Sequence, residues 1–224
     1  MRSLADFPVE KLVDTIPDFH HVGYRIKNLK HAVKEDRAGR VNECRELIDY
    51  ALSVTDSVSR IQKAGEAGLI PMRVTHNDTK FNNVLLTKVG KGRCVIDLDT
   101  VMPGYVHYDF GDGIRTTVCT APEDEADLEK IVLDMERFEA FCAGFLGETR
   151  DSLTENEIEL LAGSAALFAY LMGIRFLTDY LEGDIYYKTH FPGQNLRRAK
   201  AQLYLCKRIL AEEKELNKII QKYI

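Results

Sequence analysis

Residues 74–112 read VTHNDTKFNNVLLTKVGKGRCVIDLDTVMPGYVHYDFGD, and this segment is the most informative part of the chain. It holds two short apolar runs, residues 83–87 and 94–98, separated by a loop with two glycines, which is typical of a β-hairpin. A third strand is predicted just upstream, at residues 72–75. The surrounding loops are rich in Asp and Asn. The segment therefore predicts a small hairpin sheet with polar side chains at its edges.

The segments on either side carry apolar residues at helical spacing. Residues 1–70 are predicted to be mostly helical, with one helix over residues 41–65. Residues 119–224 are predicted to be helical again. Their first apolar stripe consists of Leu128, Ile131, Val132, Met135, Phe138, Cys142 and Phe145. With the central segment 71–118, these parts predict an α+β fold, mainly helical, in a single domain over residues 1–224.

Helix boundaries in the last part of the chain are marked by local signals. Thr154 and Glu157 form the T-x-x-E pattern of a capping box, which opens a helix. Gly183 is the expected end of that helix, since glycine readily adopts the left-handed conformation found there. A final helix is expected after Pro192.

Composition narrows the class of protein. The chain has 224 residues, with 30 Lys+Arg against 35 Asp+Glu and a formal net charge of −5, so no nucleic-acid partner is expected. No membrane is expected either, because the most apolar stretch, residues 160–174, is shorter than the roughly 20 residues that span a bilayer. The five cysteines include no C-x-x-C pair, and residues 1–14 lack the apolar core of a signal peptide. We therefore expect a cytoplasmic protein without a disulfide framework or zinc site.

The central segment contains the pattern H-x-D-x-x-x-x-N at His76, Asp78 and Asn83, the spacing of the catalytic loop of phosphoryl-transferring kinases. The carboxylate of Asp78 could accept the proton of an attacking hydroxyl, and the amide oxygen of Asn83 could bind Mg²⁺. A second oxygen ligand is expected from Asp97, at the end of the second hairpin strand. The alternative is an Asx-rich turn in which Asp78 and Asn82 cap backbone amides. The hairpin and its strand-terminal Asp favour the catalytic interpretation.

These motifs resemble those of the aminoglycoside phosphotransferase and choline kinase family, whose fold is similar to that of protein kinases. Within that family the chain looks most similar to the N-acetylhexosamine 1-kinases. The similarity is carried by RVTHNDTKFNNV, CVIDLDTVMPG, YDFGD and GIRFLTDYLEGD, with IPDFH and PGQNL nearer the two ends, so it covers nearly the whole chain. It implies a protein-kinase-like C-terminal lobe with a small hairpin sheet at the catalytic site, and ATP as the phosphate donor together with Mg²⁺.

The resemblance implies a role for the polar residues of the segment. Asp78 would be the catalytic base, and Asn83 and Asp97 would hold Mg²⁺ against the ATP phosphates. His76 would be structural and pack beneath the loop. Asp109 would hydrogen-bond the catalytic loop from the following helix, which is compatible with the alternative of a helix N-cap.

Two further residues have open interpretations. Lys80 stands where the protein-kinase loop has a lysine that approaches the transferred phosphate, and the alternative is a solvated surface lysine. Asp99 would either support Asp97 or reach a second metal.

Arg175 interrupts an apolar helical run and is the second unusual feature of the sequence. An arginine that extends its charged end past the helix edge is the ordinary explanation. The resemblance implies instead that Arg175, together with Tyr186, binds the sugar acceptor. The remaining histidines show no ligand spacing and are expected at the surface or its boundary: His20, His21, His31, His107 and His190.

The chain departs from the family in one respect. A kinase of this type has an N-terminal β-lobe that covers the phosphates and supplies a lysine to them, yet neither GxGxxG nor GxxxxGK[ST] occurs here. We therefore expect a C-terminal lobe without its nucleotide-covering lobe, through truncation, a mis-started gene model or a natural half-protein. Alone it should transfer phosphate slowly or not at all. It should also expose an apolar face through which a homodimer could form.

The expected function is transfer of the γ-phosphate of ATP to the anomeric hydroxyl of N-acetylglucosamine or N-acetylgalactosamine. One alternative keeps the chemistry and changes the acceptor to choline, ethanolamine, an amino sugar or an aminoglycoside. Arg175 opposes that alternative, because cationic acceptors are usually bound by acidic or aromatic cages. The other alternative is a non-catalytic half-kinase that binds a sugar or a protein. The presence of Asp78, Asn83 and Asp97 opposes a decayed site.

Overall fold

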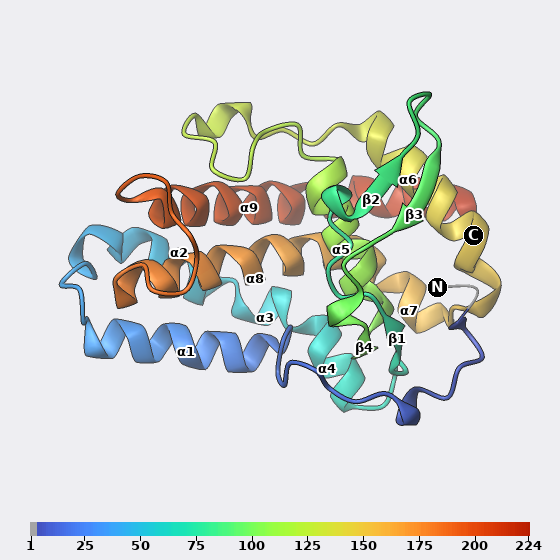
Figure 1. The fold of residues 1–224 in the computed structure, drawn as a ribbon, viewed down its shortest axis with the longest axis horizontal. Coiled ribbons are helices and arrows are strands. Elements are labelled where there is room, and N and C mark those ends of the chain that lie inside the picture. Colours follow the sequence, from blue (N-terminus) through green and yellow to red (C-terminus); the bar gives the residue numbers. More distant parts are fainter. Residues whose placement is uncertain (1–3) are drawn as a thin grey trace.

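The computed structural model describes residues 4–224, which form a mostly helical α+β fold with two small antiparallel sheets (Figure 1). The mainly helical class predicted from the sequence is confirmed. The α-helices are α1 (Val22–Glu35), α2 (Arg45–Ser53), α3 (Thr55–Val58), α4 (Arg60–Glu66), α5 (Val106–Thr117), α6 (Met135–Thr149), α7 (Glu155–Glu159), α8 (Leu161–Glu182) and α9 (Gln194–Ile220).

Each sheet consists of two short strands. β1 (Arg73–Thr75) pairs with β4 (Met102–Gly104), and β2 (Val84–Leu86) pairs with β3 (Gly92–Val95). The β2–β3 pair is the predicted hairpin. The prediction missed β4, which has only three residues and a central proline, a residue depleted in strands. It also extended β3 too far, because the chain leaves the extended conformation at Asp97, whose φ is 63°.

The core is organised around α8, which lies between α9 and α1 and is crossed by α5 (Figure 1). By length and composition α8 could cross a membrane, with 22 residues and a mean hydropathy of 1.5, so the expectation of a stretch too short to do so was wrong. However, 78% of the most apolar 18-residue stretch of α8 is buried inside the fold. A helix that is apolar all round and covered by neighbouring helices has the character of a core helix.

Several helix boundaries differ from the prediction. The helix expected over residues 41–65 is divided into α2, α3 and α4. The stripe that begins at Leu128 starts in a short 3-10 helix, Leu128–Lys130, and enters an α-helix only at Met135. Leu160 separates α7 from α8. These breaks leave the apolar spacing almost intact, so periodicity alone does not reveal them.

Two predicted helix ends are confirmed. The side chain of Thr154 accepts the backbone N–H of Glu157, while Oε2 of Glu157 accepts the backbone N–H of Thr154. Glu157 is fully buried and also pairs with Arg73 of β1 at 2.6 Å, so the cap connects a helix start to the sheet. Gly183 ends α8 with a φ of 103°.

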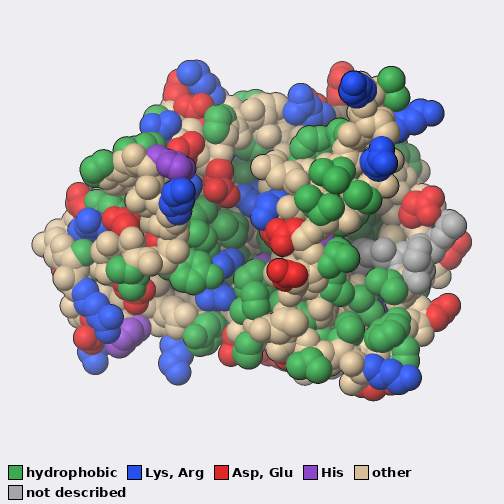
Figure 2. All heavy atoms as spheres, viewed as in Figure 1, with side chains coloured by type: hydrophobic (Ala, Val, Ile, Leu, Met, Phe, Trp, Pro, Cys, Tyr) green, Lys and Arg blue, Asp and Glu red, His purple; other side chains and the backbone are tan. Residues whose placement is uncertain are grey.

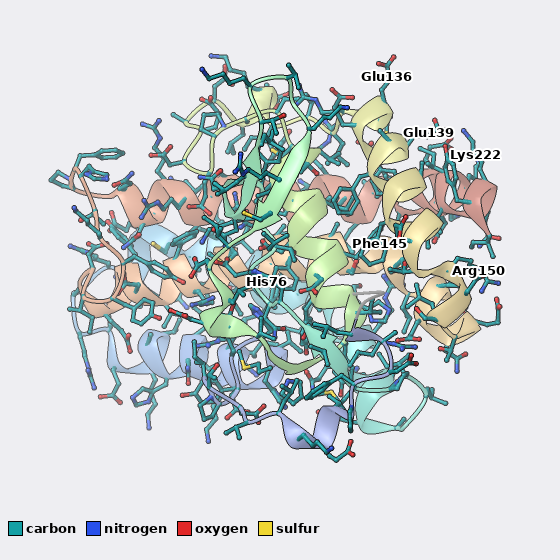
Figure 3. All side chains as sticks on the ribbon, turned by 45° about the vertical axis from the view of Figure 1, so that its right-hand side comes forward. His76, Glu136, Glu139, Phe145, Arg150 and Lys222 are labelled. Carbon is teal, nitrogen blue, oxygen red and sulfur yellow. The ribbon has the colours of Figure 1, made fainter. Side chains whose placement is uncertain are left out.

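A surface ion pair connects α6 to the C-terminal end of α9. Nζ of Lys222, just beyond α9, donates to Oε1 of Glu139 in α6 at 2.9 Å (Figure 3). Such exposed ion pairs contribute little to stability, so the packing of α6 against α9 depends on its apolar residues.

The β2–β3 hairpin projects from the helices and exposes apolar side chains, as Figure 2 shows. These side chains belong to Phe81, Leu85, Leu86, Val89, Val95, Ile96 and Leu98. The sequence analysis expects an exposed apolar face but does not assign it to this hairpin.

The crossing of α5 and α8 depends on a glycine. A Cβ atom at Gly111 would overlap the backbone carbonyl of Ser164, so only glycine lets the two helices approach this closely. Gly147, at the exposed end of α6, has open space around the same position and offers a matched comparison.

We predict that Gly111→Ala lowers the free energy of unfolding by about 1–3 kcal/mol through overpacking. Gly147→Ala should raise it by about 0.5–1 kcal/mol, because alanine loses less conformational entropy in a helix. Urea unfolding followed by circular dichroism measures both. Equal effects of the two substitutions would contradict the close approach.

Candidate active site

The loop after β1 is attached to α5 by one buried carboxylate. Oδ2 of Asp109 accepts the backbone N–H of His76 at 2.9 Å, and Oδ1 accepts that of Asn77 at 2.8 Å. The hydroxyl of Thr79 donates to the backbone carbonyl of Asp109 at 2.6 Å. Burial raises the pKa of Asp109 to about 6, while the two backbone donors act in the opposite direction. The N-cap of α5 is Tyr105, so Asp109 lies inside the helix and makes the loop contact that the sequence analysis expects of it.

The carboxylate of Asp78 faces side-chain donors. Its Oδ2 accepts from Nζ of Lys80 at 2.6 Å and from Nδ2 of Asn83 at 2.8 Å. The same Nδ2 donates to the backbone carbonyl of Asp78. Asp78 therefore does not cap backbone amides, as an Asx turn would require. Nζ of Lys80 also lies 4.0 Å from Oδ2 of Asp97, so this ammonium stands between the two acids and is more than a solvated surface group.

The hairpin places Asp97 beside Asn83. The backbone N–H of Ile96 donates to the carbonyl of Asn83 at 2.9 Å, and Asp97 follows in a left-handed conformation that non-glycine residues seldom adopt. Nε2 of His76 donates to the carbonyl of Ile96 at 3.1 Å, so His76 joins the loop to the segment that carries Asp97. The carboxylate of Asp99 is exposed and makes no hydrogen bond or ion pair with any described residue.

The residues Asn83 and Asp97 fit the binding of Mg²⁺. Nδ2 of Asn83 is occupied by Asp78, which leaves its amide oxygen as an acceptor, and the side chain of Asp97 is 47% exposed. Among the described residues there is no cluster of three or more His, Cys, Asp or Glu side chains that could hold a metal. Mg²⁺ needs only one or two protein oxygens where phosphates and water supply the rest.

Two histidines expected near the surface are buried. His20 and His107 are 7% and 0% exposed, and Nε2 of each donates at 2.8 Å to a backbone carbonyl, that of Asn77 and that of Glu157 respectively. Desolvation by burial lowers the pKa of His20 to about 3 and that of His107 to about 4. Both are fixed by tertiary packing, for which the sequence carried no signal. His20 thus holds the catalytic loop through the carbonyl of Asn77, while Asp109 holds it through backbone N–H groups.

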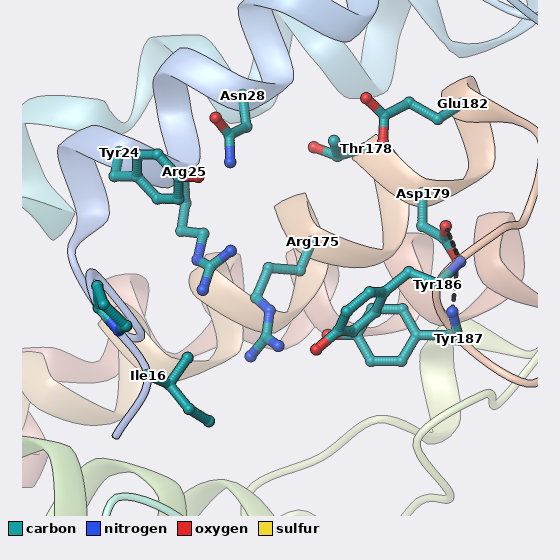
Figure 4. Close-up of a pocket in the computed structure, with 11 residues that line it drawn as sticks. Ile16, Tyr24, Arg25, Asn28, Arg175, Thr178, Asp179, Glu182, Tyr186 and Tyr187 are labelled. Carbon is teal, nitrogen blue, oxygen red and sulfur yellow. Dashed lines mark hydrogen bonds between the residues drawn. The ribbon is translucent and has the colours of Figure 1, made fainter. Parts of the chain in front are cut away.

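A cavity of about 360 Å³ lies between α1 and α8 and contains Arg175 (Figure 4). This volume is at the lower end of the ~300–1,000 Å³ of small-molecule sites. The guanidinium of Arg175 lies over the rings of Phe19 and Tyr187, at 5.3 and 5.6 Å from their centroids. Phe19 is followed by His20, whose Nε2 donates to the backbone carbonyl of Asn77, so the chain connects this cavity directly to the catalytic loop.

The two tyrosines of the cavity differ in burial. Tyr186 is 73% exposed, with its ring edge-to-face against Tyr187. Tyr187 packs on Phe176, and its buried hydroxyl has no hydrogen-bond partner within residues 4–224. Tyr187, which the sequence analysis left aside, therefore contacts Arg175 more directly than Tyr186 does.

The loop that carries these tyrosines is organised by Asp179, which the sequence analysis also missed. Oδ1 of Asp179 accepts the backbone N–H groups of Ile185 and Tyr186, and Oδ2 accepts that of Tyr187. Nδ2 of Asn195 donates to the same Oδ2 at 2.8 Å. A carboxylate inside an apolar helix was the available signal, because such a group is expensive to bury without several donors.

A family model described as the phosphotransferase enzyme family matches residues 5–140, more than half of the chain. The chain belongs to this family. The match includes the catalytic loop and α5, and it ends before Arg175 and Tyr186. Small-molecule phosphotransfer chemistry is thus supported, whereas the acceptor must be argued from the cavity itself.

We predict that buried His20 makes the fold sensitive to acid. Its pKa is lowered from 6.5 in the unfolded chain to about 3, so between these values the unfolded state binds the extra proton. Stability contributed by neutral His20 is therefore present above pH 6.5 and is lost as the pH falls. The free energy of unfolding should fall by up to about 1.4 kcal/mol per pH unit more in the wild-type chain than in His20→Gln.

Urea unfolding between pH 7 and pH 4 measures this difference. His31→Gln, which changes an exposed histidine, should keep the wild-type slope. Parallel pH profiles for wild type and His20→Gln would contradict a buried neutral histidine at this position.

Proposed function

We propose that this protein transfers the γ-phosphate of ATP to the anomeric hydroxyl of an N-acetylhexosamine. The observation that carries the proposal is the carboxylate of Asp78. It is held by Asn83 and Lys80 on a loop that Asp109 fixes from within the core. The preceding residue, Asn77, is hydrogen-bonded to His20, which follows Phe19, the residue whose ring lies under Arg175 of the cavity. Membership of the phosphotransferase enzyme family supports the reaction type.

The proposed reaction proceeds by direct displacement. The acceptor oxygen attacks the γ-phosphorus while Asp78 orients the hydroxyl and accepts its proton. A new P–O bond forms to the sugar, the bond between the γ-phosphorus and the β,γ-bridging oxygen breaks, and ADP leaves with that electron pair. Little covalent chemistry is required of the protein in such transfers, so positioning and charge compensation supply most of the rate.

Charge compensation falls to residues around Asp78. Asn83 and Asp97 would hold Mg²⁺, which when bound neutralises charge on the phosphate oxygens. The ammonium of Lys80 lies 2.6 Å from Asp78 and 4.0 Å from Asp97, a position from which it can contact a phosphate oxygen. Asp109 acts at a distance, by keeping the backbone of the loop in place.

A cationic acceptor such as choline, ethanolamine or an aminoglycoside fits the cavity poorly. Arg25 and Arg175 both line it, and their charges oppose that of a cationic ligand. The aromatic rings of Tyr24, Tyr186 and Tyr187 offer stacking surfaces that suit the apolar face of a sugar ring.

We predict that Asp78→Asn lowers phosphate transfer by at least about 100-fold, because the amide cannot accept the hydroxyl proton. Formation of sugar 1-phosphate from ATP, Mg²⁺ and N-acetylglucosamine or N-acetylgalactosamine is measured by ³¹P NMR. The protein used is the longest product of the gene that contains this chain. Asp49→Asn, which alters an exposed carboxylate on α2, is the matched control and should keep full activity.

Two outcomes would contradict the proposal. One is transfer by Asp78→Asn at the rate of the Asp49→Asn control. The other is the absence of sugar phosphorylation in the wild-type protein while choline or an aminoglycoside is phosphorylated.

A further inference from the structure

The cavity beside the catalytic loop contains two arginines that have no counter-ion among the residues that the structure describes. Figure 4 shows the guanidinium groups of Arg25, from α1, and Arg175, from α8, pointing into the same space. Neither forms a salt bridge with a carboxylate of the described residues. A positive charge that is partly desolvated and unpaired is costly, and two adjacent ones repel each other. The arrangement therefore requires an explanation beyond folding.

Arg175 has almost all of its donors free. Its hydrogen bond within the described residues runs from Nη1 to the weak acceptor Sδ of Met172, at 3.8 Å. The rings of Phe19 and Tyr187 hold the guanidinium in position, but ring contacts leave its charge and its planar set of N–H groups available.

Arg25 is only partly occupied. Its Nε and Nη2 donate to the backbone carbonyl of Phe19 at 3.2 and 2.8 Å, which fixes the side chain without neutralising it. Burial lowers the pKa of Arg25, and the neighbouring charge of Arg175 lowers it further. The pair is thus held together against its own repulsion by contacts that do not cancel the charge.

The two acidic residues that line the cavity, Asp179 and Glu182, do not form ion pairs with these arginines. Asp179 is 3% exposed and directs both oxygens to backbone N–H groups of the tyrosine loop and to Asn195. Glu182 lies beyond Thr178, at the end of the cavity away from the two guanidinium groups (Figure 4). One end of the cavity is therefore positive, and its charge is unmatched.

We propose that the acceptor carries an anionic group, a carboxylate or a phosphate, which Arg25 and Arg175 bind together. This inference rests on the proposed function, since it assigns the acceptor of the same site. The chemical class is an acidic sugar: a hydroxyl near Asp78 receives the phosphate, and the anionic substituent is held by the arginines at the positive end of the cavity. Guanidinium groups suit this task because their planar donors match the oxygens of carboxylates and phosphates.

The test compares sugars that differ in one anionic group. N-acetylglucosamine 6-phosphate is compared with N-acetylglucosamine, and glucuronate with glucose, by isothermal titration calorimetry on the protein. The anionic member of at least one pair should bind about tenfold or more tightly than its neutral partner. Binding of ATP with Mg²⁺ is measured in parallel.

Matched variants identify the residues responsible. Arg25→Met and Arg175→Met should each abolish the preference for the anionic sugar, while Arg37→Met, which removes an exposed arginine at the far end of α1, should keep it. Arg25→Lys retains the charge and should keep part of the preference, which separates loss of charge from local misfolding. Thermal unfolding verifies that each variant is folded.

Several results would overturn the inference. Equal binding within both pairs, or no binding of either anionic sugar, would contradict an anionic acceptor. A preference that survives in both methionine variants would show that the two arginines do not cause it. A loss of ATP binding in these variants equal to the loss of sugar binding would assign the arginines to the nucleotide. Phosphorylation is assayed separately. Transfer to N-acetylglucosamine without an anionic preference would leave the proposed function intact, whereas anionic binding without phosphorylation of any sugar would leave only the binding inference.

Discussion

The site depends on the pair of hydrogen bonds by which Asp109 accepts the backbone N–H groups of His76 and Asn77. Burial of this carboxylate is costly, and its raised pKa shows that the donors do not fully offset the desolvation. The cost is tolerated because the alternative would leave two backbone donors of the loop without partners inside the protein. Asp109, which is anchored in the core, therefore fixes the backbone at His76 and Asn77 and so sets the orientation of Asp78, the residue that follows them.

The cavity between α1 and α8 is organised in the same way. Asp179 accepts three successive backbone N–H groups and thereby fixes the loop of Tyr186 and Tyr187, as Asp109 fixes the catalytic loop. Each carboxylate comes from a buried helix, and each organises a segment that has little regular structure of its own. Functional side chains are thus carried on loops, while their positions are set by helices that pack in the core. Neither acid needs to touch a substrate.

The sequence predicted which residues form the site better than it predicted the contacts that those residues make. His76, Asp78, Asn83 and Asp97 follow a local spacing, and the structure brings them together because the hairpin connects them over a short distance along the chain. Contacts between distant segments were missed. No local signal connects His20 with the carbonyl of Asn77, and the interrupted helices over residues 41–65 keep an apolar spacing that a continuous helix would share. Local sequence patterns indicate which face of a helix or strand is buried, whereas the segment that packs against this face is determined by the tertiary structure.

Charges of opposite sign lie on two neighbouring parts of the site. The acids Asp78 and Asp97 lie at the catalytic loop, whereas Arg25 and Arg175 line the cavity between α1 and α8, and the charges of Asp78 and both arginines act on the buried His20. Desolvation and the two arginines lower the pKa of this histidine, so it stays neutral and adds no charge of its own. Because His20 is neutral, it does not weaken the electric field between the two acids and the two arginines. An acceptor with a hydroxyl at one end and an anionic group at the other would align with that field, and the loop hydrogen bonds would then present its hydroxyl to Asp78.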